Sequence, residues 1–416
     1  MRAAAEDASA AGYHVIALDR FGDRDLRALC DHWQCLDEDW PRQIDAWPTA
    51  PIVPTGGFAW PTEGRAPAGR LIAYPDASRL EALADPAELR DVAAGCGIDF
   101  PATMSADRWS VASEGTTRLP GGAANWLIKP RERAGGVGIR RCSAAAEAPP
   151  RQGEDLQQWV AGRPLGVSYI ARKRQGQMAV RLLGACIGLT HRKHPHWPWL
   201  YAGSIGPQPL ASQCRDRLAH FGERIAQRFQ LVGLFNVDFI LRRNGSLVLL
   251  EINPRYSASM ELLARGDRSG AAAPQISFID WHLAAYQEAA GQIGTAAADE
   301  RMQWAGLADA GERSRLGVTA ELACKRIVYA RQPLRVDPTA AELTAMVRQH
   351  LPGLCSSAMR SRSTAISFCD LPSLGQEVAA GHPALTVILR GGGDTKTLAR
   401  SSLRIARELC RRLRSL

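Results

Sequence analysis

Two apolar runs joined by Asn-Gly constrain the fold of this chain more than any other stretch. The segment from Val237 to Glu261 reads VDFILRRNGSLVLLEINPRYSASME. Asn-Gly between apolar runs is the strongest short hairpin signal, because a type I′ turn needs positive φ at both central residues. The sequence therefore predicts an antiparallel hairpin that turns at Asn244-Gly245, with Arg243 facing Ser246.

The same register brings polar side chains together across the hairpin. In it Asp238 faces Glu251 and Asn236 faces Asn253, and residues two apart on a strand share a face. Facing carboxylates repel, and Mg²⁺, which prefers oxygen ligands, would compensate. We therefore predict a magnesium site with Asp238, Glu251 and Asn253 as ligands and Arg255 within reach of a phosphoryl group. The alternative is a solvated hairpin whose acids pair with nearby arginines.

Composition sets broad limits on the class of protein. The chain has 416 residues, 46% of them hydrophobic and 22% charged, which suits two or three globular domains. We find no apolar run long enough to cross a bilayer and no signal-peptide pattern in the acidic N-terminal stretch, so we expect no membrane association. Ten dispersed cysteines without a C-x-x-C pair favour the reducing cytoplasm over a disulfide framework.

The formal net charge is +9, and much of it comes from arginine. This is typical of a GC-rich genome, but it also suits attraction to an anionic ligand such as a nucleotide or an acidic substrate. No recognised nucleic-acid module is present, so we expect no nucleic-acid partner. The sequence leaves the oligomeric state open.

The order of predicted elements indicates a mixed α/β chain. It begins with an alanine-rich helical segment and a strand over Tyr13–Leu18, in a small parallel α/β unit. Such units usually begin with a strand, so a first strand is missing or the fold is trimmed there. Further elements follow in order: a helix from Asp85-Pro86 to Gly97, a strand 125–130, two strands within 154–174, a helix 214–229, a polar helical stretch 266–317, and an α/β unit ending in an amphipathic helix 398–416.

A lysine and a glycine-rich loop follow the strand that begins at Asn125. Lys129 lies at the strand end, and the stretch RERAGGVGIRR comes directly after Pro130. Glycines let backbone N–H groups approach phosphates closely, although such a loop alone is also typical of plain turns.

Taken together, these segments resemble the ATP-grasp superfamily over about 85–261. VDFILRRNGSLVLLEINPR is similar to its metal-binding signature, NWLIKPRERAGGVGI to its lysine strand and flexible glycine loop, and LQQWVAGRPLGVSYIA to its adenine-contacting linker. The resemblance implies an α/β and α+β architecture with the ATP-grasp fold. It has an N-terminal Rossmann-like pre-ATP-grasp domain (1–84), an ATP-grasp domain of two α+β subdomains split near 160 (85–285), and a small C-terminal α/β domain (316–416).

The resemblance also implies a chemistry that uses ATP and Mg²⁺. Such enzymes mostly phosphorylate a carboxylate to an acyl phosphate, which an amine then attacks; Mg²⁺ offsets the charge that develops. Lys129 and Arg255 are then the catalytic residues that neutralise phosphoryl charge. The expected nucleotide-binding residues are Lys129, Gly135, Gly136, Gly138, Gln158, Trp159 and Val160.

One departure from the family pattern keeps other functions open. Many members carry acids in and after the linker, one of them for ribose, where this chain has Gln157, Gln158 and Pro164. The missing acids favour a nucleotide-binding partner protein without catalysis, whereas the intact metal ligands and Lys129 favour a carboxylate–amine ligase. A carboxylase-type or kinase-type reaction is a third reading.

The segment LTHRKHPHWPWLYAGSIGP contains His191, His194 and His196. Their irregular spacing, without an adjacent acid or cysteine, argues against a metal cluster. The segment is instead a plain loop or a substrate-facing loop suited to an aromatic or acidic substrate. YAGSIGP, ALDRFGDRDLRA and LPSLGQEVAAGHPALTVILRGG resemble relatives of tyramine–glutamate ligase, which implies small-molecule carboxylate and amine substrates in the biosynthesis of one-carbon cofactors of the methanofuran or tetrahydromethanopterin kind.

Overall fold

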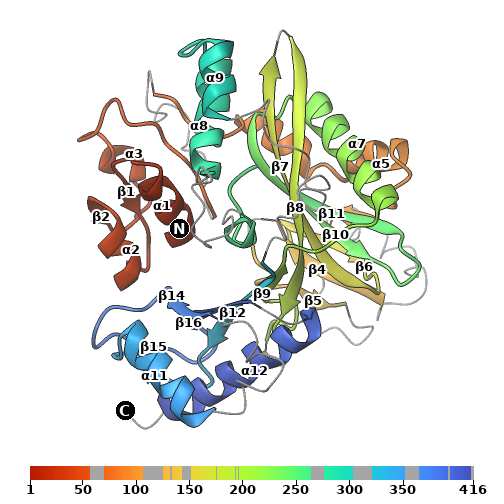
Figure 1. The fold of residues 1–416 in the computed structure, drawn as a ribbon. Coiled ribbons are helices and arrows are strands. Elements are labelled where there is room, and N and C mark those ends of the chain that lie inside the picture. Colours follow the sequence, from red (N-terminus) through yellow and green to blue (C-terminus); the bar gives the residue numbers. More distant parts are fainter. Residues whose placement is uncertain are drawn as a thin grey trace.

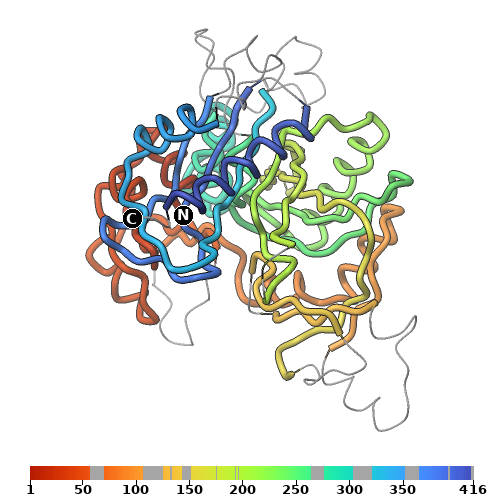
Figure 2. Tube along the Cα trace, turned by 90° about the horizontal axis from the view of Figure 1, so that it is seen from below, coloured from red at the N-terminus to blue at the C-terminus, as the bar shows by residue number. Residues whose placement is uncertain are grey.

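The computed structural model is built around one large antiparallel sheet with helices on both faces and a smaller sheet projecting from it (Figures 1 and 2). It describes residues 1–56, 70–105, 125–131, 134–142, 151–174, 176–192, 194, 196–263, 276–302, 321–351, 365–391 and 394–413. None of the helices in these ranges is long and apolar enough to cross a membrane.

The large sheet has eight strands in the order β11-β10-β7-β8-β9-β12-β16-β14, and every neighbouring pair is antiparallel. Their bounds are β7 (Arg163–Arg174), β8 (Gln177–Thr190), β9 (Tyr201–Gly206), β10 (Gly233–Leu241), β11 (Leu247–Asn253), β12 (Ala323–Tyr329), β14 (Ala365–Cys369) and β16 (Pro383–Arg390). The β9–β12 pairing joins the predicted C-terminal unit to the central domain in one sheet, so the predicted domain limits do not coincide with a break in the sheet.

Each face of the large sheet has its own hydrophobic core. On one face α7 (Ser212–Phe229) packs against the sheet, with the Phe221 and Phe239 ring centroids 5.5 Å apart. On the other face α8 (Phe278–Ala289) buries Trp281. Figure 1 shows the two helices on opposite sides of β7 and β10. This sandwich makes β10 and β11 a rigid platform for side chains at their ends.

The N-terminal part confirms the small parallel unit. It contains α1 (Arg2–Ala10), β1 (Ile16–Leu18), α2 (Arg24–Leu29), β2 (His32–Gln34) and α3 (Trp40–Gln43). The two strands pair in parallel across α2. Next come α4 (Ala77–Ala84) and α5 (Pro86–Gly95). Asp85 caps α5 by accepting the Ala87 N–H at 2.8 Å, as the Asp-Pro signal predicts.

A four-stranded sheet in the order β3-β6-β4-β5 forms the projecting subdomain. Its strands are β3 (Thr103–Ser105), β4 (Trp126–Pro130), β5 (Arg140–Arg141) and β6 (Glu154–Gln158). Trp126, Ile128 and Leu156 pack together on one face. Strand alternation therefore turns Lys129 and Gln157 to the opposite face. Figure 2 shows this part standing away from the N- and C-terminal parts.

The remaining elements lie mostly in the C-terminal part. They are η2 (Met260–Leu262), α9 (Thr295–Arg301), β13 (Leu334–Arg335), α11 (Ala340–His350), β15 (Glu377–Val378) and α12 (Thr395–Arg412). The last is the predicted amphipathic helix: it buries Leu398, Ile405 and Leu409 against β12 and β16. The predicted polar helical stretch 266–317 is described only over 276–302.

The predicted two-residue turn of the hairpin is wrong. Arg242 N–H donates to the Ser246 carbonyl at 2.9 Å and Gly245 N–H donates to the Arg242 carbonyl at 3.1 Å, so Arg243 does not face Ser246. The loop has three residues, and Gly245 carries the positive φ of 83°. Three-residue loops of this kind end in a residue with left-handed backbone, a position where glycine is favoured.

A β-bulge restores the register that the shorter turn would have given. Phe239 pairs with Leu249, but the next pair is Asp238 with Glu251, so Leu250 is an extra residue in β11. The predicted pairing of the two carboxylates is therefore confirmed, although its derivation missed both the longer loop and the bulge.

The bulge also decides which face of the hairpin carries the acid. Leu247 and Leu249 lie in the core beneath α7. Regular alternation would turn Glu251 and Asn253 to this same buried face. The extra residue reverses the alternation, so Ile252 enters the core instead and Glu251 joins the polar face.

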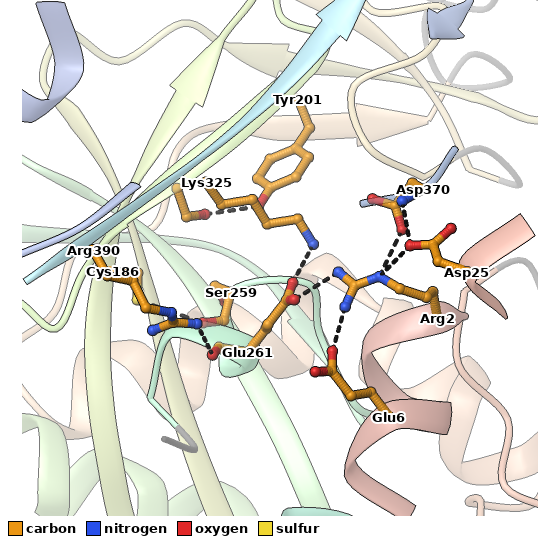
Figure 3. A network of polar contacts seen from close by, with 11 residues as sticks. Arg2, Glu6, Asp25, Cys186, Tyr201, Ser259, Glu261, Lys325, Asp370 and Arg390 are labelled. Carbon is orange, nitrogen blue, oxygen red and sulfur yellow. Dashed lines mark hydrogen bonds and ion pairs between the residues drawn. The ribbon is translucent and has the colours of Figure 1, made fainter. Parts of the chain in front are cut away.

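A buried ionic network joins the N-terminal, central and C-terminal parts (Figure 3). Glu261, in η2, accepts from Arg2 of α1 at 2.6 Å and from Lys325 of β12 at 2.7 Å. Arg2 also donates to Asp370 at 3.0 Å and to Glu6 at 2.6 Å. We call this set of five side chains the Glu261 network. Its charges are paired and mostly inaccessible to water, so it ties the three parts together.

Candidate nucleotide and metal site

Two facing carboxylates mark the end of the β10–β11 hairpin. Asp238 accepts from the Asn236 amide at 2.8 Å, and Asn253 donates to Asp238 at 3.2 Å and to Glu251 at 3.3 Å. Ser168, on the neighbouring β7, donates to Asn236 at 3.1 Å. The predicted set of Asp238, Glu251 and Asn253 therefore converges, supported by a hydrogen bond from the next strand.

The surroundings shift the pKa values of the two carboxyls in opposite directions. Burial and the adjacent Glu251 carboxylate raise the pKa of Asp238 to about 7. Partial desolvation would also raise the pKa of the half-exposed Glu251 carboxyl, but the Lys129 ammonium holds it below its usual range. Near neutral pH the cluster thus carries less negative charge than two free carboxylates, and a bound cation would replace the proton.

Lys129 reaches this cluster from the smaller sheet. Its Nζ lies 3.7 Å from Glu251 Oε2, with the lysine side chain 20% and the glutamate side chain 49% exposed. It also donates to Gln157 at 3.2 Å, and Gln157 in turn donates to Thr103 at 3.3 Å. Residues on two different sheets therefore bring one ammonium and two carboxylates to the same place.

The oxygen donors fit a magnesium ion that is shared with phosphates. Within the described ranges no group of three His, Cys, Asp or Glu side chains is arranged to hold a metal ion. A metal here would therefore need ligands beyond the two acids, which is how Mg²⁺ is commonly held on nucleotides. Asn253 presents its amide nitrogen to the carboxylates and its Oδ1 to Arg255. A half-turn of that amide would present Oδ1 to the ion and would give up the hydrogen bond from Arg255.

Arg255 lies directly beyond the metal cluster. It donates to Asn253 Oδ1 at 3.0 Å and to the Tyr256 carbonyl at 3.3 Å. These contacts hold the guanidinium beside Asn253, and the placement of Arg255 near a phosphoryl group stays a prediction.

The three glycines of the loop all adopt left-handed backbone. Gly135, Gly136 and Gly138 have φ of 69°, 79° and 80°. Gly135 accepts the Tyr201 N–H at 2.8 Å. A Cβ at Gly136 would overlap the carbonyl oxygen of Trp199. The loop therefore needs glycine both for its conformation and for its seat against the chain before β9.

The linker residues lie at the end of β6, an inner strand of the smaller sheet. The amides of Gln158 and Trp159 are bonded to the Ala102 and Asn125 carbonyls at 2.8 and 2.7 Å. Trp159 is 38% exposed, so it is not a core residue. The Val160 amide has no partner within the described part of the chain and is the backbone group left to contact a base.

The described residues of the histidine segment form no metal cluster. His194 Nδ1 accepts from the Trp197 N–H at 3.0 Å, its Nε2 lies 3.3 Å from the Gly381 carbonyl, and its ring stacks on Trp197. Its two nitrogens are thus engaged in holding the segment's shape. Burial and nearby cations lower the pKa of His191, so that ring stays neutral.

Two features of the site were not predicted from the sequence. Gln157 was noted only as a missing acid, and the structure places it against Lys129. Trp199 and Arg141 were not assigned to the nucleotide site. The only sequence signal was the aromatic character of WPWLY, which does not show that this segment seats the glycine loop.

A protein-family model covers the part of the chain that carries this site. Residues 89–259 match the family model of the ATP-grasp domain. No curated protein matches the sequence of the chain.

Solved structures match nearly the whole chain. N5-carboxyaminoimidazole ribonucleotide synthetase from Thermus thermophilus is 18% identical with a TM-score of 0.59, covering 98% of this chain and 95% of that one. L-amino acid ligase from Bacillus licheniformis is 13% identical with a TM-score of 0.59, covering 98% and 95%. The biotin carboxylase domain of a single-chain bacterial carboxylase is 15% identical with a TM-score of 0.61, covering 97% and 85%.

Residues 89–259 therefore contain an ATP-grasp domain, and the described part of the chain has the ATP-grasp fold. This confirms the predicted fold class and the resemblance over about 85–261.

Proposed function

We propose that the protein is an ATP- and Mg²⁺-dependent ligase that activates a carboxylate as an acyl phosphate for attack by an amine. The observation that carries the proposal is the meeting of Lys129 with Glu251 at 3.7 Å, opposite Asp238. An ammonium beside paired acids, with a glycine loop that follows the lysine strand, suits phosphoryl transfer, in which catalysis is mostly positioning and charge stabilisation.

The residues of the chain have distinct parts in this reaction. Asp238, Glu251 and Asn253 would hold Mg²⁺, which when bound offsets the charge that develops on the transferred phosphoryl group. Lys129 and Arg255 bind and orient the phosphates. The loop that includes Gly136 would offer its backbone N–H groups to the phosphates and limit the access of water.

Gln157 supports an active rather than a degenerate site. Its amide oxygen orients the Lys129 ammonium at 3.2 Å without neutralising it. A carboxylate at this position would form an ion pair with Lys129 and reduce the positive charge available to phosphates. The replacement of an acid by glutamine is thus compatible with a lysine that binds phosphate strongly.

The solved relatives named above include carboxylases as well as ligases. The alternatives are therefore a carboxylation that proceeds through the same ATP chemistry, a kinase-type transfer, and a nucleotide-binding protein without turnover. Within the ligase proposal, the segments YAGSIGP and ALDRFGDRDLRA favour small carboxylate and amine substrates of one-carbon cofactor biosynthesis.

Thermal stability with a non-hydrolysable ATP analogue and Mg²⁺ tests the binding step. Ligands that bind only the native state raise the melting temperature by mass action. We expect a magnesium-dependent rise in the wild type and in Asp216→Ala, which removes an exposed carboxylate on α7, but not in Glu251→Ala. No rise in folded wild-type protein at saturating nucleotide would overturn the proposal.

Product analysis then separates the reactions. A panel of acids and amines is screened for ADP release. ADP with an amide supports the ligase, whereas ADP with a carboxylated or a phosphorylated product supports the carboxylase or the kinase alternative. Magnesium-dependent nucleotide binding without release of ADP in any combination would favour the non-catalytic alternative.

A further inference from the structure

One arginine, just after the glycine loop, packs against two tryptophans. Arg141 ends β5, and its Cζ lies 4.9 Å from the ring centroid of Trp159 and 5.6 Å from that of Trp199. Trp159 follows β6 of the smaller sheet, whereas Trp199 precedes β9 of the large sheet. A single guanidinium therefore links two tryptophans that belong to different sheets. We call these three residues the Trp159–Arg141–Trp199 bridge.

The bridge lies beside the backbone that would carry the nucleotide. Trp159 is flanked by Gln158 and by Val160, whose amide is the one left to contact a base. Trp199 is the residue whose carbonyl leaves no room for a side chain at Gly136. The two tryptophans thus mark the base end and the phosphate end of the proposed site.

The segment that carries Trp199 is itself firmly held. The Nε2 atom of His194, in this segment, lies 3.3 Å from the Gly381 carbonyl oxygen. The His194 ring also stacks on Trp197 at a centroid distance of 5.1 Å. Tyr329 donates from its hydroxyl to the Tyr201 carbonyl at 2.7 Å. Trp199 therefore lies in a segment that is held to the large sheet, and Arg141 of the smaller sheet packs against it.

We propose that Arg141 is a positioning residue for nucleotide binding, which acts by clamping Trp159 and the glycine loop to Trp199. The inference rests on the proposed function for its ligand, a purine nucleotide with Mg²⁺. Arg141 follows the loop by only a few residues, so fixing it limits the conformations open to Gly135–Gly138. A pre-organised loop loses less conformational freedom when it closes on phosphates.

The energetics suit a role in affinity rather than in folding. Cation–π contacts near the surface contribute modestly, and a nearby arginine can stack on indole rings. We therefore expect Arg141→Gln to weaken binding of a non-hydrolysable ATP analogue with Mg²⁺ about tenfold. It should change the turnover number less than twofold, so the effect falls on the KM for ATP. Arg141→Lys, which keeps the charge but not the planar group, should lie between.

A double-mutant cycle tests whether Arg141 acts through Trp199. Trp199→Leu should weaken nucleotide binding to a similar degree, and adding Arg141→Gln to it should have little further effect, because either change by itself breaks the bridge between the two tryptophans. Arg174→Gln provides the control: it alters an exposed arginine at the far end of β7 and should bind nucleotide as the wild type does. Additive losses in the double variant would overturn the proposal.

A second measurement needs no nucleotide and so separates this inference from the proposed function. Hydrogen exchange of the backbone over 134–142 is compared between the nucleotide-free wild type, Arg141→Gln and Arg174→Gln. We expect exchange in this range to become several-fold faster only in Arg141→Gln, because the loop is released from Trp199. Unchanged exchange would overturn the bridge even if nucleotide binds. Faster exchange in a protein that binds no nucleotide would instead overturn the proposed function and the ligand assigned to the bridge.

Discussion

Two clusters of charged side chains, whose central glutamates are Glu251 and Glu261, are built on opposite principles. In the Glu261 network, Arg2 and Glu261 are 3% and 4% exposed and lie 2.6 Å apart. The Lys325 ammonium, 2.7 Å from the Glu261 carboxylate, supplies a second positive charge beside it. At the hairpin, Asp238 faces a like charge on Glu251, and the nearest cation, Lys129, stands 3.7 Å away from Glu251 in partial contact with water.

The pKa shifts of the carboxyls also differ between the Glu261 network and the hairpin. Burial alone would raise the pKa of Glu261, but Lys325 and Arg2 hold it below its usual range. Burial and Glu251 together raise the pKa of Asp238 to about 7. Charges that hold the fold together are compensated within the chain. Charges at the proposed site are left for a metal and phosphates to compensate, and that deficit is the physical basis of binding.

The largest expected effect comes from breaking the Glu261 network. Glu261→Gln leaves Arg2 and Lys325 buried without their shared carboxylate, and removing one partner of a buried pair destabilises by about 3–5 kcal/mol. Urea unfolding measures the loss. The matched control is Arg228→Ala, which breaks an exposed 2.5 Å pair with Glu88 and should lower the free energy of unfolding by less than about 1 kcal/mol.

If Glu261→Gln does not fold, Asp370→Asn is the milder variant, since it alters only the 3.0 Å partner of Arg2. Equal effects of Glu261→Gln and of the surface control would show that the network does not hold the three parts together.

Removing a charge at the hairpin should not lower the free energy of unfolding, in contrast to the Glu261 network. Asp238→Asn removes one of two facing like charges, so the free energy of unfolding without ligand should stay the same or rise by up to about 1 kcal/mol. The variant should nevertheless lose the stabilisation by Mg²⁺ and nucleotide, which is about 2.7 kcal/mol at a ligand concentration of 100 times Kd. Melting curves with and without ligand measure both. A clear loss of stability without ligand would mean that Asp238 serves the fold.

The two clusters should also differ in their dependence on pH. Because the pKa of Glu261 is lowered from 4.5 in the folded state, its contribution to stability is present above that value and is lost as pH falls through the folded pKa. Because the pKa of Asp238 is raised to about 7, the folded chain takes up a proton below pH 7, and protonation competes with the metal.

Magnesium-dependent nucleotide affinity should therefore fall by up to about tenfold per pH unit between pH 7 and pH 5, while the free protein keeps its fold. Titrations of affinity and of unfolding over pH 8 to 4 test this pair of expectations. An affinity that is independent of pH would contradict the assignment of Asp238 as a metal ligand.

The smallest expected effect concerns the partner of Lys129. Gln157→Glu would pair with the ammonium and draw it from the phosphates, so nucleotide affinity should fall about two- to fivefold, consistent with a partly exposed ion pair of about 0.5–1 kcal/mol. Gln158→Glu adds the same charge at the exposed neighbouring position and should have less effect. Titration calorimetry compares the two, and tighter binding by Gln157→Glu would contradict the orienting role given to Gln157.

Local signals in the sequence were sufficient for much of the framework. The Asp85-Pro86 cap and the strand that ends near Lys129 were predicted from neighbouring residues, and both are present. The ATP-grasp resemblance was carried by the order and spacing of three segments rather than by any single motif. These predictions succeeded because caps, turns and strand alternation depend on residues close together in the chain.

The hairpin shows where local reasoning reaches its limit. The sequence indicated that Asp238 faces Glu251, but the route to that result assumed a two-residue turn and no irregularity. The structure has a longer loop, and Leu250 is inserted as a bulge. The bulge follows from packing: Leu247 and Leu249 must enter the core beneath α7, whereas Glu251 must stay out of it.

By itself, then, the sequence determined the elements, the ATP-grasp framework and the residues that meet at the hairpin, since each depends on short-range pattern. Only the tertiary structure decided that Arg2, Glu261 and Lys325 share one buried network, and that the segment around Trp199 seats the glycine loop. Such contacts depend on how sheets and helices pack. Contacts between residues hundreds of positions apart produce no periodic pattern in the sequence from which they could be predicted.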